Sequence, residues 1–484
     1  MPFPGFLAPS SRNQMAYLRL LAISFGFLAA TAKSTFQPLG VAFKSPVTVA
    51  PGFSASVLFS NLTTPRGIAF DASHNLLVVE RGFGVTAFNP VSSPTPGWLR
   101  TVVIENAAFT QGIQVDGSNL YVSTAGDALL YRYDATSKSI STLVPPRSVV
   151  TGIPADGELT THTLQLEKDP TGRSVALLIA SGPKTNIDVT ARDPASGRSQ
   201  IRRFVLPAGV LDPPPPTSGI AFPPPLNWAD GQVIAFGIRN PAGFAFPPSI
   251  PPPTDPLQTR TLVVVENGAS IDNTTGLTKT FVNDNPADEA ELVTYPTNLN
   301  GPLELPIPAP KSYGFPDCTT LWNGAADPVG DPQFVGKPRG FQFSLQLDPT
   351  RNDAWCQNKL NNQPPILSFQ AHSVPLDIKF FNPSPIITSS AKAFPASFIN
   401  QPFVSFHGSF DRTPPTGYGV VRVPSLFGPG VSTALGYTFL IQATNLSTCP
   451  GTCIRPVGLA FGEHDARLYV SSDSSGELFV IERA

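Results

Sequence analysis

Basic residues of this 484-residue chain stand repeatedly at the start of short apolar phrases. Arg66 precedes Gly-Ile-Ala-Phe, Arg239 and Asn240 precede Pro-Ala-Gly-Phe, His372 precedes Ser-Val-Pro-Leu, and Arg455 precedes Pro-Val-Gly-Leu. A single residue of this kind would be interpreted as an ordinary solvated turn residue. Because basic residues recur at the same position of a repeated unit, we expect their side chains to lie on the same face of the protein. Arginine binds carboxylates and histidine exchanges protons near neutral pH. The pattern therefore predicts a site for an anionic ligand and for proton abstraction.

Histidine is rare enough to be considered residue by residue, because the chain contains only 5. His74 and His464 stand in polar turns between apolar phrases, so we expect them to be structural or solvated. His162, His372 and His407 stand at the start of phrases or beside glycine, which makes them the candidates for proton transfer.

The apolar phrases form a repeat that extends through the chain. Each unit is a short strand, a polar turn and a second strand, as in Gly67-Ile-Ala-Phe followed by Leu76-Leu-Val-Val. Units begin near residues 67, 112, 163, 243, 376 and 458, the third and fifth being looser copies. Repeated β-hairpins of this kind predict an all-β fold, a six-bladed β-propeller with long inserted loops. A pair of β-sandwiches is the alternative, but it predicts no repeated phrase.

The C-terminal sequence Glu-Leu-Phe-Val-Ile-Glu-Arg at 477–483 is similar to Leu-Leu-Val-Val-Glu-Arg at 76–81. We therefore expect the last strand to close the ring beside the first blade.

Composition excludes several classes of protein. Charged residues are 14% of the chain, the formal net charge is −2, and there is no basic run, which argues against nucleic acid as a partner. The 55 prolines and 39 glycines make a mainly helical fold improbable. After residue 32 we find no apolar stretch that could cross a membrane, so we expect no membrane partner.

The first 32 residues have the pattern of a secretory signal. Arg12 and Arg19 precede the apolar run 20–30, and Ala30-Thr31-Ala32 is a small-x-small cleavage site. A membrane anchor is the alternative, but the run is shorter than the ~20 residues that a membrane span needs. We predict a secreted protein with one propeller domain over residues 33–484.

Two further features are typical of exported proteins. The sequons for N-glycosylation are at Asn61, Asn273 and Asn445. The 4 cysteines fall into two local pairs, which predicts the disulfides Cys318–Cys356 and Cys449–Cys453. A zinc site is the competing interpretation, but a second close cysteine pair or a nearby histidine is missing.

Seven phrases of this chain, in order, resemble those of the pyrroloquinoline-quinone (PQQ)-dependent sugar dehydrogenases. The resemblance is greatest to the secreted fungal pyranose dehydrogenases, often labelled sorbosone dehydrogenases. The phrases cover residues 64–70, 236–244, 264–273, 313–318, 369–376, 407–418 and 455–462. The fold of that family is a six-bladed propeller, which agrees with the independent count of units.

The resemblance implies that the anomeric hydroxyl of a pyranose, or of a related keto-sugar, is oxidised by hydride transfer to PQQ. Arg239 matches the family's cation beside the reacting carbonyl, where it stabilises developing negative charge. Three cofactor carboxylates suit arginine forks. The cofactor-binding residues expected on this basis are Arg66, Asn240, His372, His407, Arg412 and Arg455.

The same resemblance implies a Ca²⁺ ion that polarises the quinone. Its ligands would be backbone carbonyls of Gly268 and Ala269, and a second acidic segment contains Asp288 and Glu289. A solvated loop is the alternative interpretation of Asp288 and Glu289.

The family phrase that contains the base, the residue that removes the sugar's hydroxyl proton, is matched least well in this chain. The family phrase is His-x-Thr-Arg-Thr-Leu, and here His162 stands in its arginine slot while Leu159 stands in its histidine slot. We predict His162 as the base, with Glu158 as the fallback and His372 or His407 as further alternatives. Gln111 stands where the fungal branch more often has histidine, and we predict that it contacts the substrate.

Two other functions remain open at this stage. Six-bladed propellers also include metal-dependent hydrolases such as lactonases, and a secreted propeller can bind carbohydrate without catalysis. Some fungal relatives carry haem and cellulose-binding modules for which this chain has no room, so we expect a separate external electron acceptor.

Overall fold

The computed structural model describes residues 34–207, 210, 222–252, 259–271, 276–297, 309–383, 390–426, 435–462, 464 and 466–484. The predicted signal, residues 1–32, and the sequon at Asn273 lie outside the described residues. Asn61 and Asn445 are both exposed, as glycosylation would require. Within the ranges above, no helix has the length and apolar character needed to cross a membrane.

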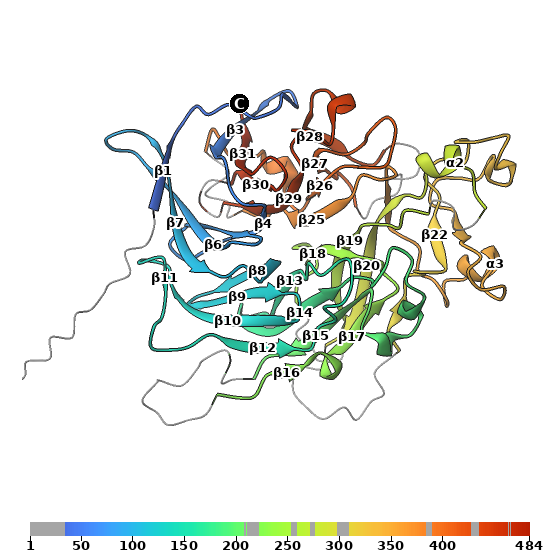
Figure 1. Cartoon of the computed structure of the whole chain (residues 1–484), viewed down its shortest axis with the longest axis horizontal. Coiled ribbons are helices and arrows are strands. Elements are labelled where there is room, and N and C mark those ends of the chain that lie inside the picture. Colours follow the sequence, from blue (N-terminus) through green and yellow to red (C-terminus); the bar gives the residue numbers. More distant parts are fainter. Residues whose placement is uncertain are drawn as a thin grey trace, which may run out of the picture.

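The chain is a six-bladed β-propeller, as the repeat predicted. Figure 1 shows the sheets arranged around a central axis. The innermost strands are β4 (Pro65–Phe70), β8 (Phe109–Asp116), β13 (Leu164–Lys168), β18 (Pro241–Ala245), β25 (Pro375–Phe380) and β29 (Pro456–Phe461). Each begins within about three residues of a unit predicted from the repeat.

The remaining strands follow outward in each blade. The second strands are β5 (Leu76–Glu80), β9 (Asn119–Thr124), β14 (Ser174–Ser181), β19 (Thr259–Glu266), β26 (Pro402–Phe406) and β30 (Leu468–Ser472). The third strands are β6 (Gly84–Val91), β10 (Asp127–Asp134), β15 (Gln200–Val205), β20 (Asp288–Pro296), β27 (Gly419–Arg422) and β31 (Glu477–Arg483). The fourth strands are β7 (Gly97–Glu105), β12 (Arg147–Thr151), β17 (Gln232–Phe236), β24 (Leu367–Phe369), β28 (Thr438–Ala443) and β3 (Phe53–Phe59).

Short elements decorate the edges of this ring. The added edge strands are β1 (Ser34–Pro38) on β7, β2 (Val47–Val49) on β28, β11 (Ser139–Ile140) on β10, β16 (Leu226–Asn227) on β12 and β21 (Lys311–Ser312) on β17. The helices are α2 (Lys279–Asn283), α3 (Asp353–Cys356), η1 (Val189–Arg192), η2 (Pro194–Ser196), η3 (Trp228–Asp230), η4 (Pro332–Phe334), η6 (Ala396–Phe398) and η7 (Leu446–Thr448). An insertion before β24 forms a separate two-stranded sheet, β22 (Cys318–Thr320) with β23 (Gln342–Ser344), beside α3 at the right of Figure 1.

Closure of the ring differs in detail from the prediction. The C-terminal strand β31 is the third strand of the sixth blade, and its outer partner is β3, with Phe53 opposite Arg483. A strand from the start of the chain thus completes the last blade. The backbone hydrogen bonds of β3 with β31 therefore join the two ends of the propeller.

The glycine that recurs in the repeat is explained by packing at the axis. A Cβ atom on Gly67 would lie 2.1 Å from the carbonyl oxygen of Gln111, and one on Gly112 would lie 2.4 Å from that of His162. The innermost strands of neighbouring blades therefore approach too closely for any side chain at these positions. Ser123 on a second strand adds a hydrogen bond of 2.8 Å to the His162 carbonyl of the next blade.

Buried apolar side chains hold neighbouring sheets together. One cluster combines Phe403 and Ile441 of the fifth blade with Leu459 and Phe479 of the sixth. Burial of large apolar side chains contributes about 1.5–3 kcal/mol each. The core of the molecule is therefore a set of layers between blades rather than one central core.

Both predicted disulfides are confirmed. Cys318–Cys356 joins β22 to α3 inside the insertion, and Cys449–Cys453 closes a short loop before β29. Because all 4 cysteines are in disulfides, the zinc interpretation is wrong.

Strand direction determines where the polar residues meet. In an antiparallel hairpin the start of one strand and the end of the next lie at the same edge. Residues that precede the innermost strands therefore share one face of the ring with residues that follow the second strands. We call this the mouth face.

Candidate functional site

Asp473, directly after β30, joins residues from three blades at the mouth face. Its Oδ2 accepts from Nη1 of Arg66 at 2.5 Å, and its Oδ1 accepts from Nε2 of His407 at 2.8 Å. Arg455 lies beside them, with Nε donating to the carbonyl of His407 at 3.0 Å and Nη2 donating to that of Gly408 at 2.7 Å. The fold thus brings together the predicted residues Arg66, His407 and Arg455.

Burial and charge determine the protonation of this cluster. Burial alone would raise the pKa of Asp473, but His407 and Arg66 together hold it below its ordinary value. Burial lowers the pKa of His407, and Asp473 offsets this only in part. At neutral pH we therefore expect a carboxylate that accepts from the Nε2–H of a neutral imidazole. Nδ1 is then the nitrogen that can accept a proton.

Gln111 spans the centre of the ring just below this cluster. Its Oε1 accepts from Arg66 at 2.5 Å, and its Nε2 donates to Thr163 at 3.1 Å and to the carbonyl of Ala242 at 3.3 Å. The side chain is buried and lines a small cavity of about 30 Å³ between the innermost strands, which we call the axial cavity. The contacts make Gln111 a positioning residue for Arg66. Its contact with substrate stays a prediction.

Arg239 is held rigidly in another part of the mouth face. Its Nε and Nη2 donate to the carbonyl and side-chain oxygens of Asn186, both at 3.0 Å. Its Nη1 donates to both oxygens of Asn267 at 3.1 and 2.9 Å and to the carbonyl of Gly268 at 3.0 Å. All these partners are neutral amide groups. The guanidinium of Arg239 is therefore fixed in place with its positive charge, and no carboxylate is among its hydrogen-bond partners. Asn240 lies beneath this group, where its carbonyl accepts from the N–H of Asn267 at 3.2 Å.

A cavity of about 80 Å³ lies beside Arg239, and we call it the outer cavity. Its lining residues are Asn186, Arg239, Asn267, Gly268, Ala269, Ser270, Pro286, Asp288, His372, Val374, Phe410 and Asp411. The outer cavity therefore brings together the predicted residues Arg239, Gly268, Ala269, Asp288 and His372.

The acidic segment at the start of β20 is buried, so the solvated-loop interpretation is wrong. Asp288 and Glu289 are 4% and 8% exposed. Asp288 accepts from the backbone N–H of Gly268 at 2.9 Å and of Val374 at 2.7 Å. Burial nevertheless raises its pKa. Glu289 does not line the outer cavity. The two residues predicted as one ligand set therefore lie in different surroundings.

His372 is paired in a way that favours its cation. Nε2 contacts the carbonyl of Val282 at 2.9 Å, and Nδ1 lies 3.3 Å from Asp411. Burial alone would lower the pKa of His372, but Asp411 and the carbonyl raise it above its ordinary value. An imidazolium with both N–H groups engaged is poorly suited to act as a base. Arg412, on the same loop as Asp411, pairs with Asp284.

His162, the predicted base, is not presented to either cluster. It is 1% exposed, and its two ring nitrogens lie 2.8 Å from the carbonyl oxygens of Ala180 and Ala125. Burial lowers its pKa. Because both nitrogens face backbone oxygens, His162 links the second and third blades and has no nitrogen free for a sugar.

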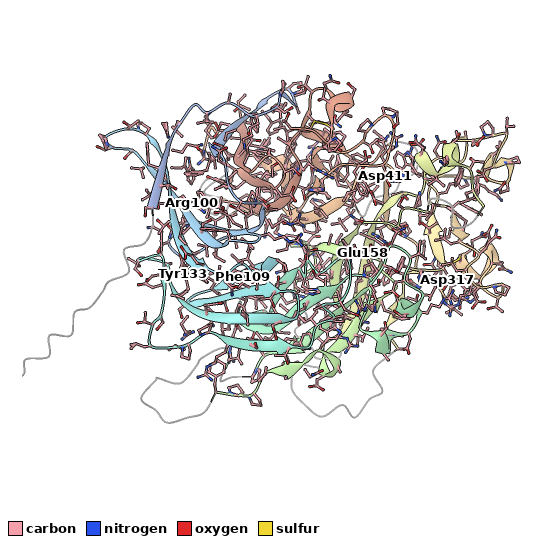
Figure 2. All side chains as sticks on the ribbon, in the orientation of Figure 1. Arg100, Phe109, Tyr133, Glu158, Asp317 and Asp411 are labelled. Atoms are coloured by element: carbon pink, nitrogen blue, oxygen red, sulfur yellow. A yellow bond between two sulfur atoms is a disulfide. The ribbon has the colours of Figure 1, made fainter. Side chains whose placement is uncertain are left out.

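Glu158, the fallback base, is exposed. Burial lowers the pKa of Arg239, and the negative charge of Glu158 offsets this in part. Figure 2 labels Glu158 near the centre of the ring and Asp317 in the insertion at the right.

His74 and His464 lie in turns on the face opposite the mouth, where their rings contact each other in an exposed position. They lie outside the mouth clusters, as the sequence predicted.

Sequence reasoning missed several residues of the site. These are Asn186, Asn267, Asp411 and Asp473. Each follows a second strand, whereas the recurrence that predicted Arg66, Arg239 and Arg455 lies at the start of the innermost strands. The ends of the second strands were already apparent in the repeat, so that signal could have found these residues.

The fold and the mouth face define a six-bladed propeller with fixed arginines around a central site. The chain belongs to the TrAA12-like family, whose model matches residues 47–484.

Among curated proteins it is similar to the "Pyrroloquinoline quinone-dependent sugar dehydrogenase" of Hypocrea jecorina (strain QM6a). The two are 30% identical over 474 residues, which is 96% of each chain. The "Pyrroloquinoline quinone-dependent pyranose dehydrogenase" of Coprinopsis cinerea is 29% identical over 90% of this chain and 54% of its own length.

Solved structures show the same relationship. The "Calcium structure of Trichoderma reesei Carbohydrate-Active Enzymes Family AA12" has a TM-score of 0.73 at 28% identity, covering 92% of this chain and 99% of that one. The "Holo form of Pyranose Dehydrogenase PQQ domain from Coprinopsis cinerea" has a TM-score of 0.69 at 27% identity, covering 91% and 98%.

Proposed function

We propose that this chain is a PQQ-dependent sugar dehydrogenase that oxidises the anomeric hydroxyl of a pyranose or a related keto-sugar. Relatives named for this activity match nearly the whole chain at about 30% identity. The observation in the structure that carries the proposal is the charge of Arg239 and Arg455. Within the described ranges both guanidinium groups bond only to amide and carbonyl oxygens. They therefore retain positive charge for an anionic ligand.

The other two predicted cofactor arginines are already neutralised. Arg66 pairs with Asp473, and Arg412 pairs with Asp284. We therefore assign binding of the quinone's carboxylates to Arg455 first, with Arg66 holding Asp473 in place. When bound, the quinone supplies the hydride acceptor. Arg239 stabilises negative charge on the oxygen beside it, because its position is fixed before the reaction starts.

Proton removal is assigned to His407. Asp473 fixes its tautomer through Nε2, which leaves the lone pair of Nδ1 to take the sugar's hydroxyl proton. Asp473 stabilises the imidazolium that this step produces. This assignment replaces His162, whose nitrogens both face carbonyl oxygens.

A Ca²⁺ ion in the outer cavity is part of the proposal. Gly268 and Ala269 line the cavity, and backbone carbonyls are hard oxygen ligands of the kind that Ca²⁺ prefers. Asp288 orients this segment by accepting the N–H of Gly268.

The competing hydrolase is less well supported. A propeller lactonase needs several carboxylates around one central metal, but Asp377 is the only carboxylate among the residues that line the axial cavity. We also propose that residues 1–32 direct secretion of the protein and that the electrons pass to a separate external acceptor.

The test is reconstitution of the purified apoprotein with PQQ, CaCl₂ and a panel of pyranoses, measured as dye reduction. We expect sugar-dependent reduction only when PQQ and Ca²⁺ are both present. Arg455→Ala is expected to weaken PQQ binding by roughly 10- to 100-fold, the value of a charge-assisted hydrogen bond. Arg239→Lys is expected to lower kcat by roughly 100-fold or more.

The matched control is Arg467→Ala. Arg467 lies on the opposite face and pairs with Glu482, so the same charge is removed far from the mouth. A folded protein that binds no PQQ would overturn the proposal. PQQ binding without turnover of any pyranose in the panel would favour a non-catalytic binding protein.

A further inference from the structure

A pocket of about 340 Å³ lies beside the outer cavity, and we call it the side pocket. Its volume is within the range of roughly 300–1,000 Å³ that is typical of small-ligand sites. The residues that line it include Ser409, Phe410, Thr413, Pro414, Ser447 and Pro450. Phe410 lines the outer cavity as well, so its ring lies between the two. The side pocket therefore adjoins the proposed site of sugar oxidation.

The segment 407–411 connects the proposed base to the outer cavity and carries Phe410 between them. It begins at His407 and ends at Asp411, whose Oδ1 lies 3.3 Å from Nδ1 of His372. Both His372 and Asp411 line the outer cavity. Figure 2 labels Asp411 in this segment. A sugar whose anomeric hydroxyl lies at His407 would therefore have the ring of Phe410 beside it.

Phe410 presents a large apolar ring to solvent from a backbone that is fixed on both sides. The residue is 74% exposed. Before it, the N–H of Ser409 donates to the carbonyl of Thr416 at 3.0 Å. After it, the N–H of Thr413 donates to Oδ1 of Asn283 at 2.8 Å. A ring that is positioned before binding costs little conformational entropy when a ligand covers it.

The side pocket offers hydroxyl groups and apolar rings without a free charge. Among the residues that line it Arg412 alone is ionisable, and its guanidinium pairs with Asp284. An anionic ligand would therefore find no unpaired cation there. A pyranose has an apolar face of C–H groups that packs on an aromatic ring, and hydroxyls at its edge that need hydrogen-bond partners. Exposed members of the pocket suit both needs, namely Thr413, Ser447, Pro414 and Pro450.

We propose that the side pocket binds the second sugar of the substrate, so that the chain oxidises the reducing end of a neutral disaccharide or longer oligosaccharide. This inference rests on the proposed dehydrogenase, which places the reactive sugar at His407. C1 of that sugar loses a hydride to the quinone and its hydroxyl loses a proton to His407, which leaves a lactone. The next sugar stacks on Phe410 and takes no part in the reaction. Phe410 therefore determines specificity rather than chemistry.

The competing occupant with the same chemistry is a glycan of this chain. The sequon residue Asn445 lies two residues before Ser447, and its Oδ1 accepts from the N–H of Ser447 at 3.1 Å. We assign the pocket to the substrate because its aromatic ring, that of Phe410, is on the loop of the proposed base rather than on the loop of Asn445. The experiment therefore uses the protein both before and after enzymatic removal of N-glycans.

The test compares glucose with cellobiose, maltose and lactose, three disaccharides that share a reducing-end glucose, on protein loaded with PQQ and CaCl₂. We expect kcat/KM for at least one disaccharide to exceed that for glucose by roughly 10-fold, mainly through a lower KM, because contacts to a non-reacting sugar bind substrate and transition state alike. Phe410→Ala should bring this ratio of kcat/KM values near one, and Phe410→Trp should keep it. Phe36→Ala is the matched control and should keep the ratio, because Phe36 is an exposed ring on the edge strand β1.

A ratio near one for all three disaccharides in the wild-type chain would overturn the proposal, and so would a ratio that Phe410→Ala leaves unchanged. A preference that appears only after the N-glycans are removed would assign the pocket to the glycan of Asn445, which also overturns it.

A second measurement separates this inference from the proposed dehydrogenase. If none of the four sugars is oxidised, calorimetry with their methyl β-glycosides on the apoprotein decides, since these compounds lack the anomeric hydroxyl. Binding of a disaccharide glycoside roughly 10-fold tighter than methyl β-glucoside, and lost in Phe410→Ala, would support the side pocket even though the dehydrogenase had failed. Equal binding, or none, would overturn the side pocket.

Discussion

His407 and Asp473, 66 residues apart in the chain, are joined by a hydrogen bond of 2.8 Å between Nε2 and Oδ1. The other oxygen of Asp473 holds Arg66 from the first blade. One carboxylate therefore fixes both the tautomer of an imidazole and the place of a guanidinium. A base that is oriented by a third group is the general arrangement for proton abstraction.

The first prediction concerns this pair. His407→Asn should lower kcat by roughly 100- to 10,000-fold, because general base catalysis contributes about that much. Only the neutral imidazole accepts a proton, so kcat/KM should rise with pH through the pKa of His407. Burial lowers that pKa, so the midpoint should fall below the ordinary value of about 6.5. The measurement is kcat/KM from pH 4 to 9.

Asp473→Asn separates positioning from general damage to the site. The carboxylate of Asp473 raises the pKa of His407. Its removal should therefore move the acid limb, which is the fall of kcat/KM at low pH, to still lower pH while kcat falls. A merely structural role would not shift the limb. Glu158→Gln is the companion variant and should keep the wild-type limb. Loss of the limb in Glu158→Gln, with His407→Asn active, would make Glu158 the base instead.

The second prediction concerns Gln111, which connects four blades at the axis. Gln111→Leu removes the partner of Arg66 Nη2 and the donor to Thr163 and Ala242. Because buried polar groups lose their partners, we expect a cost of about 1–3 kcal/mol in the free energy of unfolding. Urea unfolding followed by fluorescence measures it. A change in KM that differs between sugars would support the substrate contact predicted from sequence, whereas a uniform fall in kcat would support positioning alone.

The sequence was sufficient to locate the six innermost strands, because each unit shows strand alternation and four of the six carry a glycine that permits close packing at the axis. Gly67 and Gly112 stand where a Cβ would collide with the next blade. These constraints are local and repeat with the fold. The pairing of β3 with β31 has no such signature, since it depends on two segments from opposite ends of the chain.

The site was less predictable, for a physical reason that His162 and Asp473 illustrate. A residue type tells which chemistry is available, but hydrogen bonding decides whether an atom is free to perform it. His162 begins a phrase at the expected phase, yet carbonyl oxygens face both of its nitrogens. Asp473 stands in an ordinary Ser-Asp-Ser turn, and only the folded ring brings it to Arg66 and His407.

The third prediction tests the axial packing directly. Gly112→Ala would place a Cβ 2.4 Å from the backbone carbonyl oxygen of His162, and also within 3 Å of side-chain atoms of Leu164 and Ser123. Overpacking of this kind should cost about 1–3 kcal/mol or more. Gly126→Ala is the matched control, because the nearest atoms to its Cβ would be 4.0 Å away. Equal unfolding midpoints for the two variants would contradict the explanation of the repeat.

The fourth prediction compares the two disulfides. Cys318–Cys356 spans 38 residues and Cys449–Cys453 spans 4, so the first restricts the unfolded chain much more. On loop entropy alone, replacing the first pair by serine should cost about 4 kcal/mol and replacing the second about 2 kcal/mol. Denaturant unfolding of the two double variants measures the difference.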